Sequence, residues 1–164
     1  MKASRITQYA LLLALALVLS YVEALVPLSL AVPGVKLGLP NLVIVFALYR
    51  LGFRDACVIS VLRIVMVALL FGNALSMAYS LSGAILSLSV MVLLLKYGKL
   101  SVVGVSVAGG VFHNIGQIVC AMLLLETSQI AYYLPVLLVS GTLAGIAVGV
   151  VSGLLVRHVG IKTE

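Results

Sequence analysis

Residues 106–120 read SVAGGVFHNIGQIVC and place three strongly polar side chains, His113, Asn114 and Gln117, inside an apolar run of about a membrane's thickness, from residue 102 to residue 125. At 3.6 residues per turn, one face of this predicted helix carries small and polar residues, namely Ser106, Gly110, His113, Gln117 and Cys120. The opposite face is aliphatic. Unpaired polar groups are costly at the centre of a bilayer, so we expect this polar face to line a bundle interior or a cavity.

The composition predicts an integral membrane protein of the all-α class. Of the 164 residues, 64% are hydrophobic and 9% are charged, and the mean hydropathy is +1.35. Such a chain has too few polar residues to cover a soluble core. A net charge of +6 would favour nucleic acid as a partner of a soluble protein, but eight of the ten Lys and Arg residues lie at predicted helix ends. We therefore interpret these charges as topology signals and predict membrane lipid, and no nucleic acid, as a partner.

Apolar runs and turn signals divide the chain, as one domain over residues 1–164, into six predicted transmembrane helices, at about residues 6–25, 36–51, 54–71, 76–97, 101–125 and 132–157. The positive residues then fall on one side of the membrane, with Lys36 alone on the other. This asymmetry predicts cytoplasmic N- and C-termini in a multi-pass protein of the cell membrane.

The second helix is unusual because only about 11 apolar residues follow Pro40, too few to cross a hydrocarbon core of roughly 30 Å. Two arrangements fit the sequence. Either this helix starts near Val35 and bends at Pro40, or the Pro- and Gly-rich connection 27–40 forms a lid above a short helix.

Polar residues on three helices predict one polar column through the bundle. Arg63 is well inside the third helix, His113 and Asn114 lie about 5 Å farther from the cytoplasmic side, and Glu23 and Gln117 are higher still. For Arg63 and His113, a purely structural role in helix packing is the alternative. Three polar residues within five positions of the fifth helix favour a substrate-binding site, in which Arg63 would be a fixed cation for an anionic ligand or part of a gating pair.

Lys36 is a further candidate for substrate binding because it stands beside the expected start of the second helix. A positive side chain next to free N–H groups suits a carboxylate or a phosphate. The alternative is an exposed lysine on a loop.

Small residues recur at helical spacing in two segments. Gly141, Gly145, Gly149 and Gly153 are four residues apart, and Ser76, Ser80, Gly83 and Ser87 share one helix face. Such faces allow backbones to approach closely, so we predict that they pack within the bundle.

The sequence predicts no metal site, no cofactor and no catalytic residue. Its second histidine, His158, is at the opposite end from His113, and Cys57 and Cys120 are too isolated to suggest a disulfide or a metal. No nucleotide-binding loop of the GxxxxGK type occurs. We therefore expect a protein that is not an enzyme.

Three motifs, PGVKLGLPN at residues 33–41, SLSGAILSLSVM at residues 80–91 and HNIGQ at residues 113–117, resemble those of the Gx transporter family, also catalogued as heptaprenyl diphosphate synthase component I. The resemblance extends from about residue 8 to residue 155. That family is similar to the substrate-binding S components of energy-coupling-factor transporters, which have six helices and cytoplasmic termini.

This resemblance implies a membrane-embedded binding subunit for uptake of a small solute, working with a transmembrane coupling protein and ATPase subunits. In S components an Ala-x-x-x-Ala motif on the first helix contacts the coupling subunit, and Ala10 and Ala14 match that motif. The other family name implies an alternative, a non-catalytic membrane subunit of a prenyl diphosphate synthase, quinone or electron-transfer complex. Prenyl transfer itself needs Mg²⁺ held by clustered carboxylates, whereas this chain has one Asp and three dispersed Glu.

Overall fold

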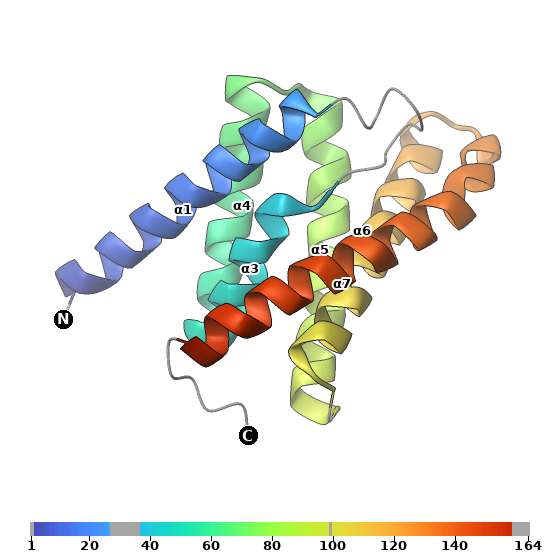
Figure 1. The fold of residues 1–164 in the computed structure, drawn as a ribbon. Helices are drawn as coiled ribbons and strands as arrows, with labels where there is room; N and C mark the ends of the chain where they lie inside the picture. Colours follow the sequence, from blue (N-terminus) through green and yellow to red (C-terminus); the bar gives the residue numbers. More distant parts are fainter. Residues whose placement is uncertain (1, 27–36, 99, 159–164) are drawn as a thin grey trace.

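The computed structural model describes residues 2–26, 37–98 and 100–158, and this part of the chain is entirely helical (Figure 1). It contains six α-helices and one 3₁₀ helix. Their bounds are α1 Lys2–Leu25, α3 Leu39–Arg50, α4 Phe53–Leu70, α5 Ala74–Tyr97, α6 Val102–Leu124, η1 Ser128–Tyr133 and α7 Leu134–His158. The expected all-α class is therefore confirmed.

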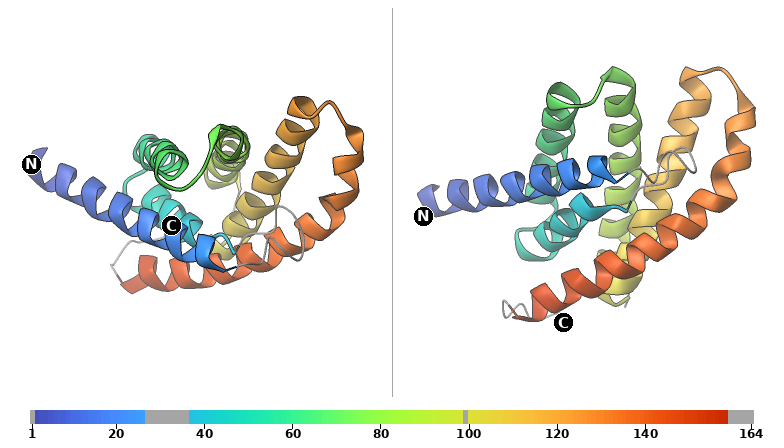
Figure 2. Two further views of the ribbon diagram at one scale, coloured as in Figure 1. Left: turned by 90° about the horizontal axis from the view of Figure 1, so that it is seen from above. Right: turned by 45° about the horizontal axis from the view of Figure 1, so that its top comes forward.

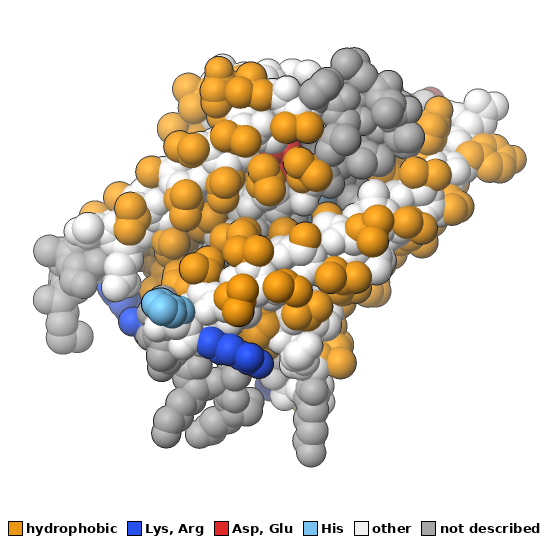
Figure 3. All heavy atoms as spheres, viewed as in Figure 1, with side chains coloured by type: hydrophobic (Ala, Val, Ile, Leu, Met, Phe, Trp, Pro, Cys, Tyr) orange, Lys and Arg blue, Asp and Glu red, His pale blue; other side chains and the backbone are white. Residues whose placement is uncertain are grey.

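Four segments of the described chain are long and apolar enough to cross a membrane: Arg5–Leu25, Ala74–Tyr97, Val102–Leu124 and Ser128–His158. Figure 3 shows hydrophobic side chains spread over the outward faces of α1 and α7, with Lys, Arg and His side chains gathered at one end. Leu123 and Tyr132 are among the most exposed of these apolar residues. This surface suits lipid and supports a membrane protein.

The two remaining helices, α3 and α4, do not meet the same criterion, so the six spans and the cytoplasmic termini stay predictions. With 12 residues, α3 is about 18 Å long. The 18 residues of α4 include Arg54, Asp55 and Arg63. Of these three charges only Arg63 is buried, whereas Arg54 is exposed near the start of the helix.

The expected start of the second helix at residue 36 is wrong. Residues Leu37 and Gly38 are not helical, and Gly38 has φ 72°, a left-handed conformation that favours glycine. The helix begins at Leu39, with Pro40 in its first turn, where proline needs no hydrogen bond and causes no bend. The short-helix arrangement is thus the one found, while the expected lid residues 27–36 lie outside the described part of the chain.

Glycines set the close packing of α5, α6 and α7. A Cβ atom at Gly145 would lie 2.6 Å from Cα of Val107, and one at Gly116 would lie 2.9 Å from Cα of Gly83. Backbones this close leave no space for a side chain. The predicted close packing is therefore confirmed for Gly83 of α5 and for Gly141, Gly145 and Gly149 of α7, and α6 is held between these two helices. Gly153 makes only ordinary van der Waals contacts, and Ser76 belongs to the capping box at the start of α5.

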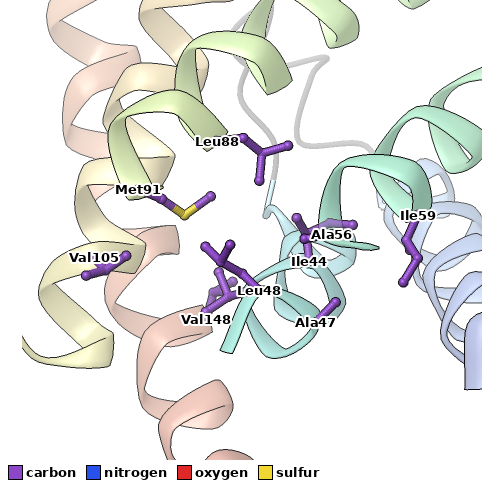
Figure 4. Packing of buried hydrophobic residues seen from close by; sticks show 10 residues of the cluster. Ile44, Ala47, Leu48, Ala56, Ile59, Leu88, Met91, Val105 and Val148 are labelled. Atoms are coloured by element: carbon purple, nitrogen blue, oxygen red, sulfur yellow. The ribbon is translucent and has the colours of Figure 1, made fainter. Parts of the chain in front are cut away.

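A hydrophobic core fills the space between α3 and its neighbours (Figure 4). Ile44 and Leu48 of α3 point toward Leu88 and Met91 of α5 and toward Val148 of α7. The short helix α3 is thus enclosed by the longer ones.

Helix α1 lies at the edge of the bundle and packs against α3 and α4. In both views of Figure 2 its N-terminal part extends beyond the other helices. Ala16 and Ser20 are buried on its inner face, whereas Ala10 and Ala14 are exposed. The outer face of α1 is therefore available to lipid or to another protein.

Candidate functional site

A polar cavity of about 60 Å³ lies between the helices, and each of the six described α-helices contributes to its wall. We call it the polar cavity. Its lining residues are Glu23 of α1, Gly38, Pro40 and Asn41 at the start of α3, Arg63 of α4, Ser80 of α5, Gly110, His113, Asn114 and Gln117 of α6, and Gly141 and Ala144 of α7.

Arg63 is the most deeply buried charge among the described residues that line the polar cavity, with 9% of its surface exposed. Its Nε atom is buried and has no hydrogen-bond partner in the described part of the chain. Arginine stays charged in proteins and presents five N–H donors, so a buried Nε–H without a partner requires an acceptor. A ligand group or water in the polar cavity can supply it.

Glu23 provides the opposite charge from the last turn of α1. Its carboxylate accepts a hydrogen bond from the backbone N–H of Gly38, which joins the end of α1 to the start of α3. The rings of Tyr21 and Phe71 meet edge to face with centroids 5.8 Å apart, so the end of α1 is also held against the end of α4. These contacts fix the Glu23 carboxylate at the wall of the polar cavity.

The Glu23 carboxylate acts electrostatically on the Arg63 guanidinium, but the two groups form no direct ion pair with an N to O distance of 4.0 Å or less. The polar cavity thus has a positive and a negative side chain in its wall without direct neutralisation between them. Space between two such groups suits a polar ligand or water.

Asn114 and His113 are oriented by contacts with the helices on either side of α6. The Asn114 Nδ2 atom donates to the backbone carbonyl of Leu137 in α7 at 2.6 Å. The His113 ring lies against Gly83 of α5, because a Cβ atom at Gly83 would be 2.9 Å from its Cε1 atom. The bond to Leu137 leaves the Asn114 side-chain carbonyl oxygen as an acceptor toward the polar cavity.

A smaller cavity of about 30 Å³ adjoins the polar cavity. We call it the apolar chamber because Ile44, Leu88, Met91 and Val148 are among its lining residues. Both cavities are lined by a common set of residues, Gly38, Asn41, Gly110, His113 and Ala144. The site therefore passes from a charged region to an apolar one within the same bundle.

Five of the six residues predicted to bind substrate lie around the polar cavity: Glu23, Arg63, His113, Asn114 and Gln117. The structure brings them together, and their role in binding stays a prediction. Lys36, the sixth, lies outside the described residues. Ala10 and Ala14, predicted to contact a coupling subunit, are far from this group on the exposed face of α1.

Sequence reasoning missed two polar residues of the wall, Asn41 and Ser80. Ser80 belongs to the small-residue face of α5, which we assigned to helix packing alone. Asn41 follows Pro40 at the start of a helix whose position in the bundle was unknown. The signal for both was a polar side chain on a predicted membrane helix, the same signal that identified Gln117.

No group of three or more His, Cys, Asp or Glu side chains suited to a metal ion occurs among residues 2–26, 37–98 and 100–158. Cys57 and Cys120 are free thiols. The chemistry that the described site offers is recognition by charge and hydrogen bonding.

Comparison with known proteins gives one family. No curated protein and no solved structure matches the chain. The family model described as heptaprenyl diphosphate synthase component I matches residues 12–155, which is most of the chain. The chain therefore belongs to the heptaprenyl diphosphate synthase component I family.

Proposed function

We propose that this protein is a substrate-binding subunit of the cell membrane, which captures a small solute for uptake and works with a separate ATP-driven coupling module. The observation that carries the proposal is the polar cavity, which is lined by the six described α-helices and by a buried Arg63 whose Nε has no hydrogen-bond partner in the described part of the chain. The resemblance to S components of energy-coupling-factor transporters supports the same function.

The size of the polar cavity supports a small solute. Its volume of about 60 Å³ is room for about four to six waters at roughly 10–15 Å³ each. A heptaprenyl chain is far larger than the space that these residues enclose. We therefore place a compact polar molecule, and not a prenyl diphosphate, in this site.

The family name favours a second candidate function, in which the chain is a non-catalytic membrane subunit of a prenyl diphosphate synthase, quinone or electron-transfer complex. The name denotes one component of a system with several parts, which implies protein partners. The chain's four carboxylates, Glu23, Asp55, Glu126 and Glu164, are widely separated in the sequence, so in this alternative the partner performs the chemistry.

Co-purification distinguishes the two candidates. The full chain, tagged and expressed with and without a coupling protein and its ATPases, is purified from membranes, and bound small molecules and proteins are identified by mass spectrometry. We expect a small polar solute and a stable complex with the coupling module. A chain that retains no solute and binds a prenyl synthase or a flavoprotein instead would favour the second function.

Replacement of both Ala10 and Ala14 with Leu is expected to block docking of the coupling module while the bundle still folds. Both side chains are exposed on α1, and added bulk at a small-residue contact separates two helices, whereas lipid accommodates Leu. The measurement is the amount of coupling protein that co-purifies with the variant.

Ala24→Leu is the matched control, because Ala24 is also exposed on α1 but lies outside the Ala10 and Ala14 pair. It should leave the complex intact. Equal recovery of the coupling protein with both variants would assign the pair to lipid contact and remove α1 from the docking surface.

A further inference from the structure

We infer that the polar cavity takes a small zwitterion of the amino-acid class, with its carboxylate on Arg63 and its ammonium group on Glu23. The inference rests on the proposed solute-binding function and adds the chemical class of the solute.

The wall of the polar cavity has side chains of opposite charge. Among the described residues of the wall, Arg63 and Glu23 carry a full charge at neutral pH, and they have opposite signs. An anion would satisfy Arg63 but would leave Glu23 as an uncompensated negative charge beside it. A cation would satisfy Glu23 but would leave Arg63 as an uncompensated positive charge. A ligand with both charges matches both side chains and keeps the buried site neutral.

Arg63 and Glu23 do not neutralise each other by direct contact. Arg63 and Glu23 interact electrostatically but form no direct ion pair, and the Arg63 Nε atom is buried without a partner. A carboxylate is the group that best fits the planar guanidinium, since two oxygens can accept from two N–H donors. The adjacent space between Arg63 and Glu23 can then hold the ammonium group.

Glu23 has acceptor capacity for that ammonium group. A carboxylate has about four lone-pair sites, and the N–H of Gly38 uses one of them. The same bond from Gly38 holds the carboxylate in place, so it need not reorganise on binding. Asn114 adds a neutral acceptor, because its amide nitrogen is already bonded to Leu137.

The adjoining apolar chamber limits the size of the ligand's side chain. It shares wall residues with the polar cavity, includes Leu88 and Met91, and has a volume of about 30 Å³, room for about two to three waters. This volume admits a short aliphatic side chain and is too small for an aromatic one. Alanine and valine are therefore the preferred probes.

The test compares a zwitterion with its two halves. Titration calorimetry on the full chain in nanodiscs measures the affinity for alanine, valine, acetate and methylammonium. We expect alanine or valine to bind at least about 30-fold more tightly than acetate or methylammonium, because acetate leaves the Glu23 carboxylate, and methylammonium leaves the buried Arg63 guanidinium, without a ligand group of opposite charge. Acetate binding as tightly as alanine, or no binding of any probe, would overturn the inference.

The variant Glu23→Gln provides an independent readout. Glutamine has the same shape and can still accept from Gly38, so the joint between α1 and α3 is kept, while the charge is lost. It should weaken alanine binding about 30-fold or more and leave acetate binding unchanged or stronger. Glu126→Gln, at an exposed residue, is the matched control and should change neither affinity.

Failure of this inference can be told apart from failure of the proposed function. If a solute that is not a zwitterion co-purifies with the wild-type chain and is lost with Arg63→Leu, the chain is a binding subunit and the zwitterion assignment is wrong. If nothing co-purifies and no probe binds, both are wrong.

Discussion

Arg63→Leu is expected to lower the affinity for the co-purified solute by at least about 30-fold while the bundle remains as stable as the wild-type protein or becomes more stable. Loss of one partner from a buried charge pair costs about 2–5 kcal/mol of binding free energy. Without a ligand, however, Arg63 is a buried cation whose Nε lacks a partner, and an apolar side chain there is neutral or stabilising.

Because solute affinity should fall while stability does not, the variant distinguishes a binding role of Arg63 from a structural one. Solute affinity is measured by calorimetry, and the free energy of unfolding by titration from mild detergent into sodium dodecyl sulfate. Arg54→Leu, on the same helix but exposed, is the matched control and should change neither quantity appreciably. Severe destabilisation by Arg63→Leu would show that Arg63 is a structural residue, and unchanged affinity would exclude it from the site.

Gly145→Ala is expected to destabilise the bundle by about 1–3 kcal/mol, the usual cost of overpacking a tight interior. The added Cβ atom would lie 2.6 Å from Cα of Val107 and 2.9 Å from the backbone carbonyl oxygen of Ser106. Since backbone atoms cannot rotate away as a flexible side chain can, α6 and α7 must separate. The same separation would displace Gly110 and Gly141, which line the polar cavity, so solute affinity should fall as well.

Gly153→Ala is the control on the same face of α7. There an added Cβ atom would meet the Cβ atom of Val102 at 3.7 Å, an ordinary van der Waals contact. Alanine is a better helix former than glycine, so this variant should be neutral or slightly more stable. Equal destabilisation by both substitutions would indicate that helix propensity or lipid contact, and not the α6 and α7 contact, determines the effect.

The position of each candidate residue along its helix could be predicted from the sequence, and its depth in the membrane stays a prediction. Arg63, His113 and Gln117 were placed in one column by counting residues along helices, because each residue of an α-helix adds 1.5 Å. The structure brings these residues to one cavity. Position along a helix is a local property, and the apolar runs predicted the ends of the long helices approximately, although α1 begins at Lys2 and not near residue 6.

The rotation of each helix about its axis could not be predicted in the same way. Ser80 faces the polar cavity, while Ser89 of the same helix is exposed and bonds back to the carbonyl of Ile85. Both are serines on one apolar helix. Only the contacts of α5 with its neighbours determine which of them points inward.

The features that the sequence determines and those that only the tertiary structure decides therefore have different physical causes. Composition and hydrophobic runs predicted the all-helical membrane class, the closely packed glycines and the group of polar residues around one cavity, because these follow from local periodicity and from the cost of burying polar groups. Only the tertiary structure decided that α3 starts at Leu39, that Glu23 bonds to Gly38, and that the buried Arg63 Nε has no hydrogen-bond partner among the described residues. These depend on how helices distant in sequence pack, which short-range pattern does not specify.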